Sequence, residues 1–545
     1  MDTAILKKFA ISARQKLINQ IKTKAHFYSI AEDAAQNIEK VATTDDSITI
    51  NGKTYNRQVK AKWENLNSCV KSKGFEQVIE EVAYTWFNRF IALRFMECNG
   101  YIERVLSSST GGRHEPDIVI HAESLELPGI DNVKVSKLKD ESKIEELYRM
   151  LIIAKCNQLH GWMPFMFEKI EDSTDYTELL LPDGLLNEGS IVRDIVSDIP
   201  EEDWKNVEII GWMYQFYMFE KKDELIKAKK KYKNNEIPIV TQLYTPDWMV
   251  RYMIDNTLGR LWLEAYPESN LRSKMEFYIE PRNLTEEEKK EIKLNAFGNI
   301  KPEEIKFLDP ACGSGHVLIY AFDLLFEIYK ESGYIERDIP KLILKNNLYG
   351  LDIDERAIQL SCFSILIKAR SKARRIFDDN VRLNVHCFVE ANDIEVNDSV
   401  LDSITNSFIN AKTNGSLITP PALNFETIDN SLNDLLNSGD LYQTSSGNLL
   451  KKVVSIAKIL NSKYHCVVTN PPYVGNKYMS SDISEYLLKK YPNTKSDLFS
   501  AFVEKCLTLS LEAGYLGFVT PFVWMFIQSY EKLRNEIIES KTITS

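Results

Sequence analysis

"IKFLDPACGSG", residues 305–315, joins a short apolar run to a glycine-rich turn, and a helical pattern follows from His316. Gly313 and Gly315 allow the backbone to come close to a ligand. No Gly-Lys-Ser/Thr follows, which excludes a Walker A loop, and the full Gly-x-Gly-x-x-Gly pattern is also missing. Asp309, at the end of the run, can accept hydrogen bonds from an amine, which favours an amino-acid ligand over a pyrophosphate. A purely structural strand-to-helix corner gives the same pattern.

Four further apolar runs beyond residue 300 also end in turn or acidic residues, and helical patterns follow several of them. This alternation predicts an α/β fold with a doubly wound, Rossmann-like parallel sheet, in which ligands bind at the carboxyl ends of the strands. A polar stretch near 395–460 indicates an insertion or a lengthened crossover. The four runs are "NLYGLDID" (347–354), "VHCFVEAND" (385–393), "YHCVVTNPPY" (464–473) and "YLGFVTP" (515–521).

The region before this sheet has a helical pattern. "VIEEVAYTWFNRFIALRFMEC" (78–98) repeats apolar and aromatic residues at three- and four-residue spacing. We interpret this stripe as a helix core, because base-stacking surfaces normally lie on exposed strands or loops. We therefore predict a helical N-terminal domain over 1–235 and the α/β domain over 236–545. The stripe consists of Tyr84, Trp86, Phe87, Phe90, Leu93 and Phe95.

Composition narrows the classes of function. The chain has 545 residues and a net charge of −11, which opposes non-specific binding of nucleic acid by the whole chain. Two basic runs, "KAKKKYK" (227–233) and "KARSKARR" (368–375), are either solvated helix faces or local basic surfaces. The eight cysteines form no C-x-x-C pair, so we predict no disulfide framework, no metal site and a cytoplasmic protein. The apolar stretch 515–527 is broken by Pro521 and is too short to cross a membrane.

Two more strand ends carry carboxylates. Asp352 ends the second predicted strand, where an acidic residue can accept hydrogen bonds from ribose hydroxyls. The alternative role for Asp352 is a helix N-cap. Asn392-Asp393 ends the third strand, and an ordinary turn explains it equally well.

The stretch "TNPPY", residues 469–473, must lie beyond its strand, because proline cannot donate to a sheet ladder. Asn470 offers a side-chain carbonyl, Pro471 a main-chain carbonyl and Tyr473 an aromatic face. Together with the rigid Pro472, they can hold a planar group that carries an amine, so that the amine lone pair turns toward an electrophile. A plain turn and a proline-rich ligand motif are the alternatives.

Taken together, these motifs resemble the γ class of amino-methylating DNA methyltransferases, which use S-adenosylmethionine. The upstream "QLYTPDWMV" (242–250) is similar to the start of a helix that completes the cofactor pocket, and Thr245 is predicted to cap a helix that begins with Pro246 and ends at Gly259 or Tyr266. "SDLFSAF" from Ser496 resembles the helix that follows the catalytic loop. The resemblance implies catalytic roles for Asn470, Pro471, Pro472 and Tyr473, and cofactor contacts from Tyr244, Thr245, Pro246, Asp309, Pro310, Ala311, Cys312, Gly313, Gly315, Asp352, Ile353, Asp393, Ile394, Asp497 and Phe499.

Within that class, the long helical N-terminus is most similar to the PglX group of methyltransferases from bacteriophage exclusion (BREX) systems, and more loosely to fused restriction-modification enzymes. The resemblance implies transfer of a methyl group to N6 of an adenine that is flipped out of double-stranded DNA. It implies catalysis by positioning, without a metal or a covalent intermediate. Other BREX proteins or a phage inhibitor are the further partners expected, and no membrane is.

The family's sheet continues with two further strands, an aromatic clamp for the flipped base and a target recognition domain. The chain ends at Ser545, after a single further helix. We therefore expect a fragment, a truncated gene product, or one half of a split protein whose partner chain supplies the rest. In each case we expect an incomplete sheet and weak or absent methylation by this chain alone.

Two other functions remain open. Glutamine-methylating enzymes of translation factors carry a similar Asn-Pro-Pro-Tyr, because a side-chain amide is also a planar amine. A cofactor-binding scaffold that holds other defence proteins without catalysis is the third possibility.

Overall fold

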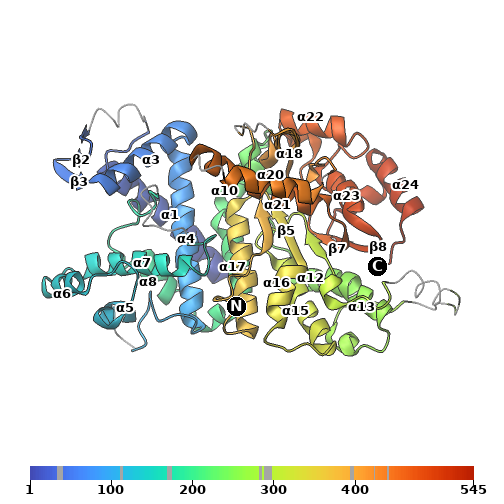
Figure 1. Ribbon diagram of the computed structural model, residues 1–545, viewed down its shortest axis with the longest axis horizontal. Helices are drawn as coiled ribbons and strands as arrows, with labels where there is room; N and C mark the ends of the chain where they lie inside the picture. Colours follow the sequence, from blue (N-terminus) through green and yellow to red (C-terminus); the bar gives the residue numbers. More distant parts are fainter. Residues whose placement is uncertain are drawn as a thin grey trace. The chain divides into compact units, whose positions relative to one another are not determined.

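The computed structural model describes residues 1–32, 41–110, 115–167, 175–281, 285, 287, 297–392, 394, 398–422, 424–437 and 441–544. They form two compact units, Met1–Glu220 and Lys221–Ser545 (Figure 1). Across the described ranges, no helix has the length and apolar character needed to cross a membrane.

The first unit is mainly helical, as the sequence predicts. α4 (Phe75–Cys98) packs between α1 (Thr3–Phe27) and α3 (Arg57–Lys73), and its aromatic stripe is at most 2% exposed, which confirms the core interpretation. Burial of such large side chains contributes strongly to the hydrophobic stabilisation of the unit. The other helices are α5 (Asp117–Ile120), α6 (Asn132–Asp140), α7 (Ile144–His160), α8 (Ile191–Ser197) and α9 (Glu208–Tyr217).

A small antiparallel sheet, which the sequence analysis did not predict, also lies in this unit. It contains β1 (Ala42–Thr43), β2 (Ser47–Ile50) and β3 (Lys53–Asn56). Asn51 and Gly52 join β2 to β3 with φ of 50° and 77°, which suits the two-residue hairpin turn that favours Asn-Gly.

The second unit contains a five-stranded parallel sheet in the order β6-β5-β4-β7-β8. All five predicted strands are present. Chain order reverses between β4 and β7, and such a reversal is where open α/β sheets bind their ligands. The strands are β4 (Phe307–Asp309), β5 (Leu348–Asp352), β6 (Asn384–Cys387), β7 (Tyr464–Thr469) and β8 (Ser510–Phe518).

Helices cover both faces of this sheet (Figure 1). α15 (His316–Glu331) packs on one face, where Leu318 lies against Gly350 of β5. α23 (Leu498–Leu509) packs on the other face, where Cys506 and Leu509 join a large apolar cluster. The remaining helices are α10 (Phe219–Ala228), α11 (Ile237–Thr241), α12 (Asp247–Ile254), α13 (Arg260–Ala265), α16 (Ile339–Asn346), α17 (Glu355–Lys372), α22 (Ser481–Lys490) and α24 (Glu531–Ser540).

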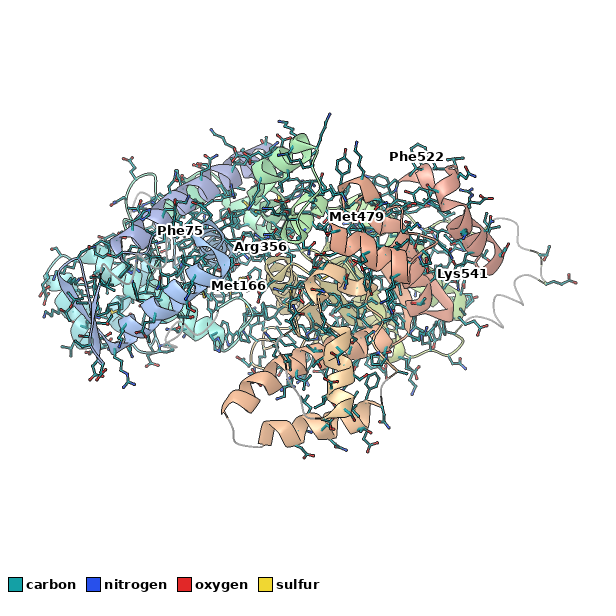
Figure 2. The ribbon with its side chains drawn as sticks, turned by 90° about the horizontal axis from the view of Figure 1, so that it is seen from above. Phe75, Met166, Arg356, Met479, Phe522 and Lys541 are labelled. Atoms are coloured by element: carbon teal, nitrogen blue, oxygen red, sulfur yellow. The ribbon has the colours of Figure 1, made fainter. Side chains whose placement is uncertain are left out.

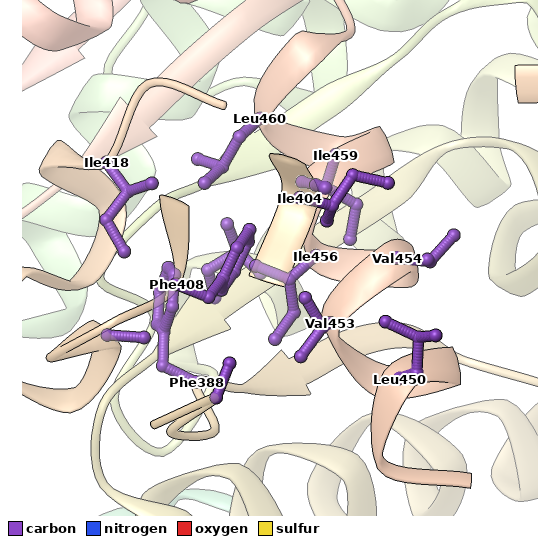
Figure 3. Close-up of a cluster of buried hydrophobic side chains, with 14 of the residues drawn as sticks. Phe388, Ile404, Phe408, Ile418, Leu450, Val453, Val454, Ile456, Ile459 and Leu460 are labelled. Carbon is purple, nitrogen blue, oxygen red and sulfur yellow. The ribbon is translucent and has the colours of Figure 1, made fainter. Parts of the chain in front are cut away.

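The polar stretch near 395–460 forms a lengthened, helical crossover from β6 to β7. Its apolar side chains, among them Ile404, Phe408 and Ile456, pack on Leu308 and Leu351 of the sheet (Figure 3). Its sequence is polar because only one side of each helix faces the sheet. The helices are α18 (Ser399–Ser407), α19 (Ala411–Asn414), α20 (Phe425–Asn437) and α21 (Leu441–Asn461).

The helix that starts at Asp247 does not end at Gly259. A buried π-helical turn (Asp255–Gly259) joins α12 to α13, which ends at Ala265. A Cβ at Gly259 would lie 2.1 Å from Sδ of Met275, so the Met275 side chain packs into the space that the glycine leaves. The prediction that the helix ends at Gly259 is therefore wrong, and the alternative, that it runs on to Tyr266, is confirmed, because Tyr266 is the C-cap residue of α13.

Candidate active site

Hydrogen bonds hold the backbone of the turn after β4 against the end of β5. The N–H of Cys312 donates to the carbonyl oxygen of Leu351 at 3.0 Å, and the N–H of Gly313 donates to Oδ2 of Asp352 at 2.9 Å. Gly313 and Gly315 have φ of 51° and 87°, which L side chains rarely adopt. A Cβ at Gly313 would meet no atom within 4 Å, so its backbone borders open space. A ligand can therefore approach the main chain of this turn closely.

Gly315→Ala is expected to destabilise the second unit by about 2 kcal/mol, because left-handed backbone strain adds to a collision. The new Cβ would lie 2.5 Å from Oγ and 3.1 Å from Cα of Ser361. Gly313→Ala is the matched control, since it has the same strain without the collision and should cost about 1 kcal/mol. Urea unfolding of both variants measures the difference, and equal losses would contradict the role of Ser361.

Asp309 lies at the carboxyl end of β4 and is 2% exposed. Its Oδ1 accepts the N–H of Ala311 at 3.1 Å. Burial, with a smaller contribution from Asp352, raises the pKa of Asp309 to about 7. Oγ of Ser416 donates a hydrogen bond to the carbonyl oxygen of the next residue, Pro310, at 2.6 Å. No local pattern in the sequence predicts this contact. A buried carboxyl with a raised pKa is poised to pair with a cationic ligand.

The free energy of unfolding should therefore fall as the pH rises from about 3.9 to about 7. The pKa of Asp309 is about 7 in the folded protein and about 3.9 in the unfolded chain. The stabilisation that the protonated carboxyl provides is therefore fully present below about pH 3.9 and is lost as the pH approaches 7. Asp309→Asn should narrow the difference in unfolding free energy between pH 5 and pH 7.5 by about 2 kcal/mol. Urea unfolding at both values tests this, with the exposed Asp378→Asn as control. An unchanged pH dependence would contradict the assignment.

Asp352 and Asp354 have different roles at the end of β5. Asp352 accepts the N–H groups of Gly313 and Asp354, both at 2.9 Å, and burial raises its pKa to about 6. Asp354 is the residue that caps α17, by accepting the N–H of Arg356 at 3.0 Å and pairing with its guanidinium (Figure 2 labels Arg356). The alternative role considered for Asp352, a helix cap, thus belongs to Asp354. Each oxygen of Asp352 keeps a further lone pair for a ligand.

The two predicted isoleucines lie near this strand end. Ile353 is half-buried and packs against the apolar cluster of Figure 3. Ile394 is 9% exposed and belongs to that cluster. Asp393, the third predicted carboxylate, lies outside the described residues.

The Asn-Pro-Pro-Tyr segment follows β7 directly, beside the turn after β4. Nδ2 of Asn470 donates to Oγ1 of Thr245 at 3.0 Å, and Oδ1 accepts from the hydroxyl of Tyr473. That hydroxyl also lies 2.6 Å from the carbonyl oxygen of Val519. Pro471 is buried, while Pro472 is half-buried. The amide of Asn470 is therefore held in one orientation from both of its ends.

Thr245 does not cap the following helix, contrary to the prediction. α12 begins at Asp247, and its N-cap residue is Pro246, which makes no side-chain cap hydrogen bond. The buried Thr245 hydroxyl binds Asn470 instead, 225 positions along the chain, which local patterns cannot reveal. His316, which the sequence analysis did not assign, lies 3.0 Å from the Thr245 carbonyl oxygen through Nδ1, and its ring stacks on Tyr244 at 4.4 Å.

Thr245→Val is expected to lower the rate of transfer about tenfold, the value of one hydrogen bond that orients the Asn470 amide. Affinity for S-adenosylmethionine should stay within about twofold of the original, and Thr241→Val is the matched control. Transfer kinetics and calorimetric titration separate the two effects. A fall in affinity alone would instead support the cofactor contact that the family resemblance implies.

Asp497 and Phe499 lie against the segment that follows Tyr473. Oδ1 of Asp497 accepts the N–H groups of Val474 at 3.0 Å and Phe499 at 3.2 Å, and burial raises its pKa to about 6. The ring of Phe499 meets that of Tyr473 edge-on, with centroids 6.3 Å apart. The structure thus brings together Thr245, Asp309, Asp352, Asn470 and Asp497 from five separate segments at one edge of the sheet.

The similar proteins found by comparison with known proteins are described as methylases or methyltransferases. The family model described as Eco57I restriction-modification methylase matches residues 346–545. The adenine-specific methyltransferase BrxX of Escherichia coli O9:H4 (strain HS) is 39% identical over 99% of this chain and 48% of its own length. The adenine-specific methyltransferase PglX of Lacticaseibacillus casei (strain Zhang) is 36% identical over 98% of this chain and 48% of its own length.

Among solved structures, the Type IIL restriction-modification enzyme MmeI in complex with DNA covers 83% of this chain and 48% of its own. Its TM-score is 0.35 with 15% sequence identity, which is too low to support a conclusion. The chain spans about half the length of the curated relatives it matches. Over nearly its whole length, the chain is similar in sequence to the adenine-specific methyltransferases BrxX and PglX.

Proposed function

We propose that this chain binds S-adenosylmethionine and carries the transfer site of an enzyme that methylates adenine N6 in double-stranded DNA. The observation that carries the proposal is the position of Asn470. Its amide is fixed between Thr245 and Tyr473 at the point where strand order reverses, next to the buried carboxyl of Asp309. The names of the relatives support the choice of adenine as the target.

The residues around the turn after β4 fit this cofactor. S-adenosylmethionine supplies a methyl group on a positively charged sulfur. Asp309 offers a buried carboxyl to its ammonium group, and Asp352 offers free lone pairs to its ribose hydroxyls. The absence of a side chain at Gly313, whose backbone borders open space, leaves room for close approach. Phe499, beside Tyr473, adds an apolar surface near the transfer site.

The Asn-Pro-Pro-Tyr segment fits an exocyclic amine. Oδ1 of Asn470 accepts from Tyr473 and keeps a second lone pair, and the carbonyl of Pro471 is a second acceptor in a rigid backbone. These two acceptors can take the two N–H hydrogens of adenine N6 while Tyr473 contacts the ring. The base must leave the duplex to reach them. The chain then acts by positioning, which supplies much of the acceleration when two reactants are held in line.

We also propose, from the resemblance to BREX methyltransferases, that the enzyme acts in phage defence. Other proteins of that system, or a phage inhibitor, are the partners expected.

Methyl-labelled S-adenosylmethionine distinguishes the acceptor. After incubation of the chain with adenine-containing duplex DNA and with a glutamine-containing translation factor, digestion and mass spectrometry should find the label as N6-methyladenine. Label on protein glutamine would overturn the choice of substrate. Cofactor binding without label on either acceptor would overturn catalysis by this chain and favour the scaffold function.

A further inference from the structure

A run of lysines lies on the second unit and has no part in the site described above. Lys229, Lys230 and Lys231 are exposed, and among the residues that the structure describes they form no ion pair. Lys227 pairs with Asp223 through the same helix, α10. The run therefore presents three uncompensated positive charges to solvent on a chain of net charge −11.

The residues that follow this run contact the segment after the Asn-Pro-Pro-Tyr loop through hydrogen bonds and ring stacking. The N–H of Tyr232 donates to the carbonyl oxygen of Tyr478 at 2.8 Å, and the two rings stack with centroids 5.8 Å apart. Nδ2 of Asn234 donates to Oδ2 of Asp482 at 3.1 Å. Ile237 packs into one apolar cluster with Val474 and Met479 (Met479 is labelled in Figure 2).

The attachment brings the lysines close to the proposed transfer site. Tyr478 follows Tyr473 by five residues, which an extended chain spans in at most about 18 Å. Lys477, in the same segment, is exposed and adds a fourth positive charge. Two carboxylates lie nearby and keep their negative charge, since Asp482 accepts from the neutral amide of Asn234 and Glu236 accepts from the backbone N–H of Lys233.

We propose that Lys229, Lys230, Lys231 and Lys477 form a surface that binds the phosphates of duplex DNA beside the flipped adenine. This inference rests on the proposed function, since a base held by Asn470 brings its own backbone to the same loop. Duplex DNA carries one negative charge about every 1.7 Å, so four neighbouring lysines can neutralise several phosphates. Such contacts hold the protein in register on the duplex without reading its sequence.

The second basic run, 368–375, differs in position and in partners. It ends α17, which starts after the carboxyl end of β5 and returns to the start of β6, so it lies at the opposite edge of the sheet. Lys368 pairs with Asp323 at 2.7 Å, and the ammonium of Lys372 lies 4.9 Å from the centre of the Phe326 ring. It therefore provides a control of equal charge away from the site.

The test compares two triple variants of the full chain. Lys229/Lys230/Lys231→Gln and the control Lys372/Arg374/Arg375→Gln each remove three positive charges. Binding to a short fluorescent duplex is followed by anisotropy between 50 and 200 mM salt, with S-adenosylmethionine present. The first variant should lose at least about tenfold in affinity at 50 mM salt, and its dependence of log K on log salt should flatten by about two to three. The control should stay within about twofold.

Unchanged binding by the Lys229 variant, or equal losses in both variants, would overturn the inference. Calorimetric titration of the cofactor into the same samples keeps the two proposals apart. An original chain that binds the cofactor but not DNA overturns the lysine surface alone. An original chain that binds neither overturns the proposed function as well.

Discussion

Asn470→Ala is expected to lower methyl transfer about 10²–10³-fold while the affinity for S-adenosylmethionine stays unchanged. The loss is this large because the amide is proposed to act on the amine as it reacts, and removal of one preorganised polar group from an active site typically costs that much. The variant also removes the acceptor of the Tyr473 hydroxyl and the donor to Thr245. Transfer of labelled methyl to DNA measures the rate.

The control is Asn493→Ala, an exposed asparagine in the same unit. It should keep full activity. Asn470→Ala with undiminished transfer would contradict the catalytic role, and loss of cofactor binding would show that the variant disturbs the pocket rather than the transfer step.

Asp352→Ala is expected to weaken cofactor binding about 10²-fold or more. The carboxylate holds the Gly313 amide at 2.9 Å, so the variant removes the proposed ribose acceptor and also loosens the turn that borders the pocket. Hydrogen bonds to charged groups contribute about 1.5–3 kcal/mol each, and two such losses account for this drop. Calorimetric titration of S-adenosylmethionine measures it.

Asp354→Ala is the matched control for Asp352. It removes the cap of α17 and the pair with Arg356, which should cost about 1 kcal/mol of stability. Its cofactor affinity should be unchanged. Equal losses of affinity in both variants would mean that the helix start, and not the Asp352 carboxylate, supports the pocket.

Short-range signals were sufficient to predict the sheet. An apolar run followed by a turn or acidic residue predicts a strand end from within about ten residues, and all five strands lie where these runs occur. The same logic predicted that Asp309, Asp352 and Asn470 meet at one edge, since the ends of parallel strands converge there. The hairpin at Asn51-Gly52 carried an equally local signal that was overlooked.

Contacts between distant segments could not be predicted. Threonine often caps helices, but the hydroxyl of Thr245 binds Asn470 instead, because the fold brings the end of β7 beside it. The bond from Ser416 to Pro310 spans 106 residues, and Gly259 is explained only by Met275. In each case a local preference is overridden by a partner that the sequence pattern does not specify.

The strand order has a consequence for how the protein is made. β4 is central and pairs with β7, in which Cys466 faces Phe307 although it follows 159 positions later. At a synthesis rate of about 5–20 residues per second, roughly 10–30 s pass between the synthesis of β4 and that of β7. During that time one edge of β4 is unpaired, and the pocket has Asp309 but not Asn470. Binding of the acceptor amine at Asn470 therefore has to follow the completion of β7, and until then the unpaired edge of β4 exposes the nascent chain to misassembly.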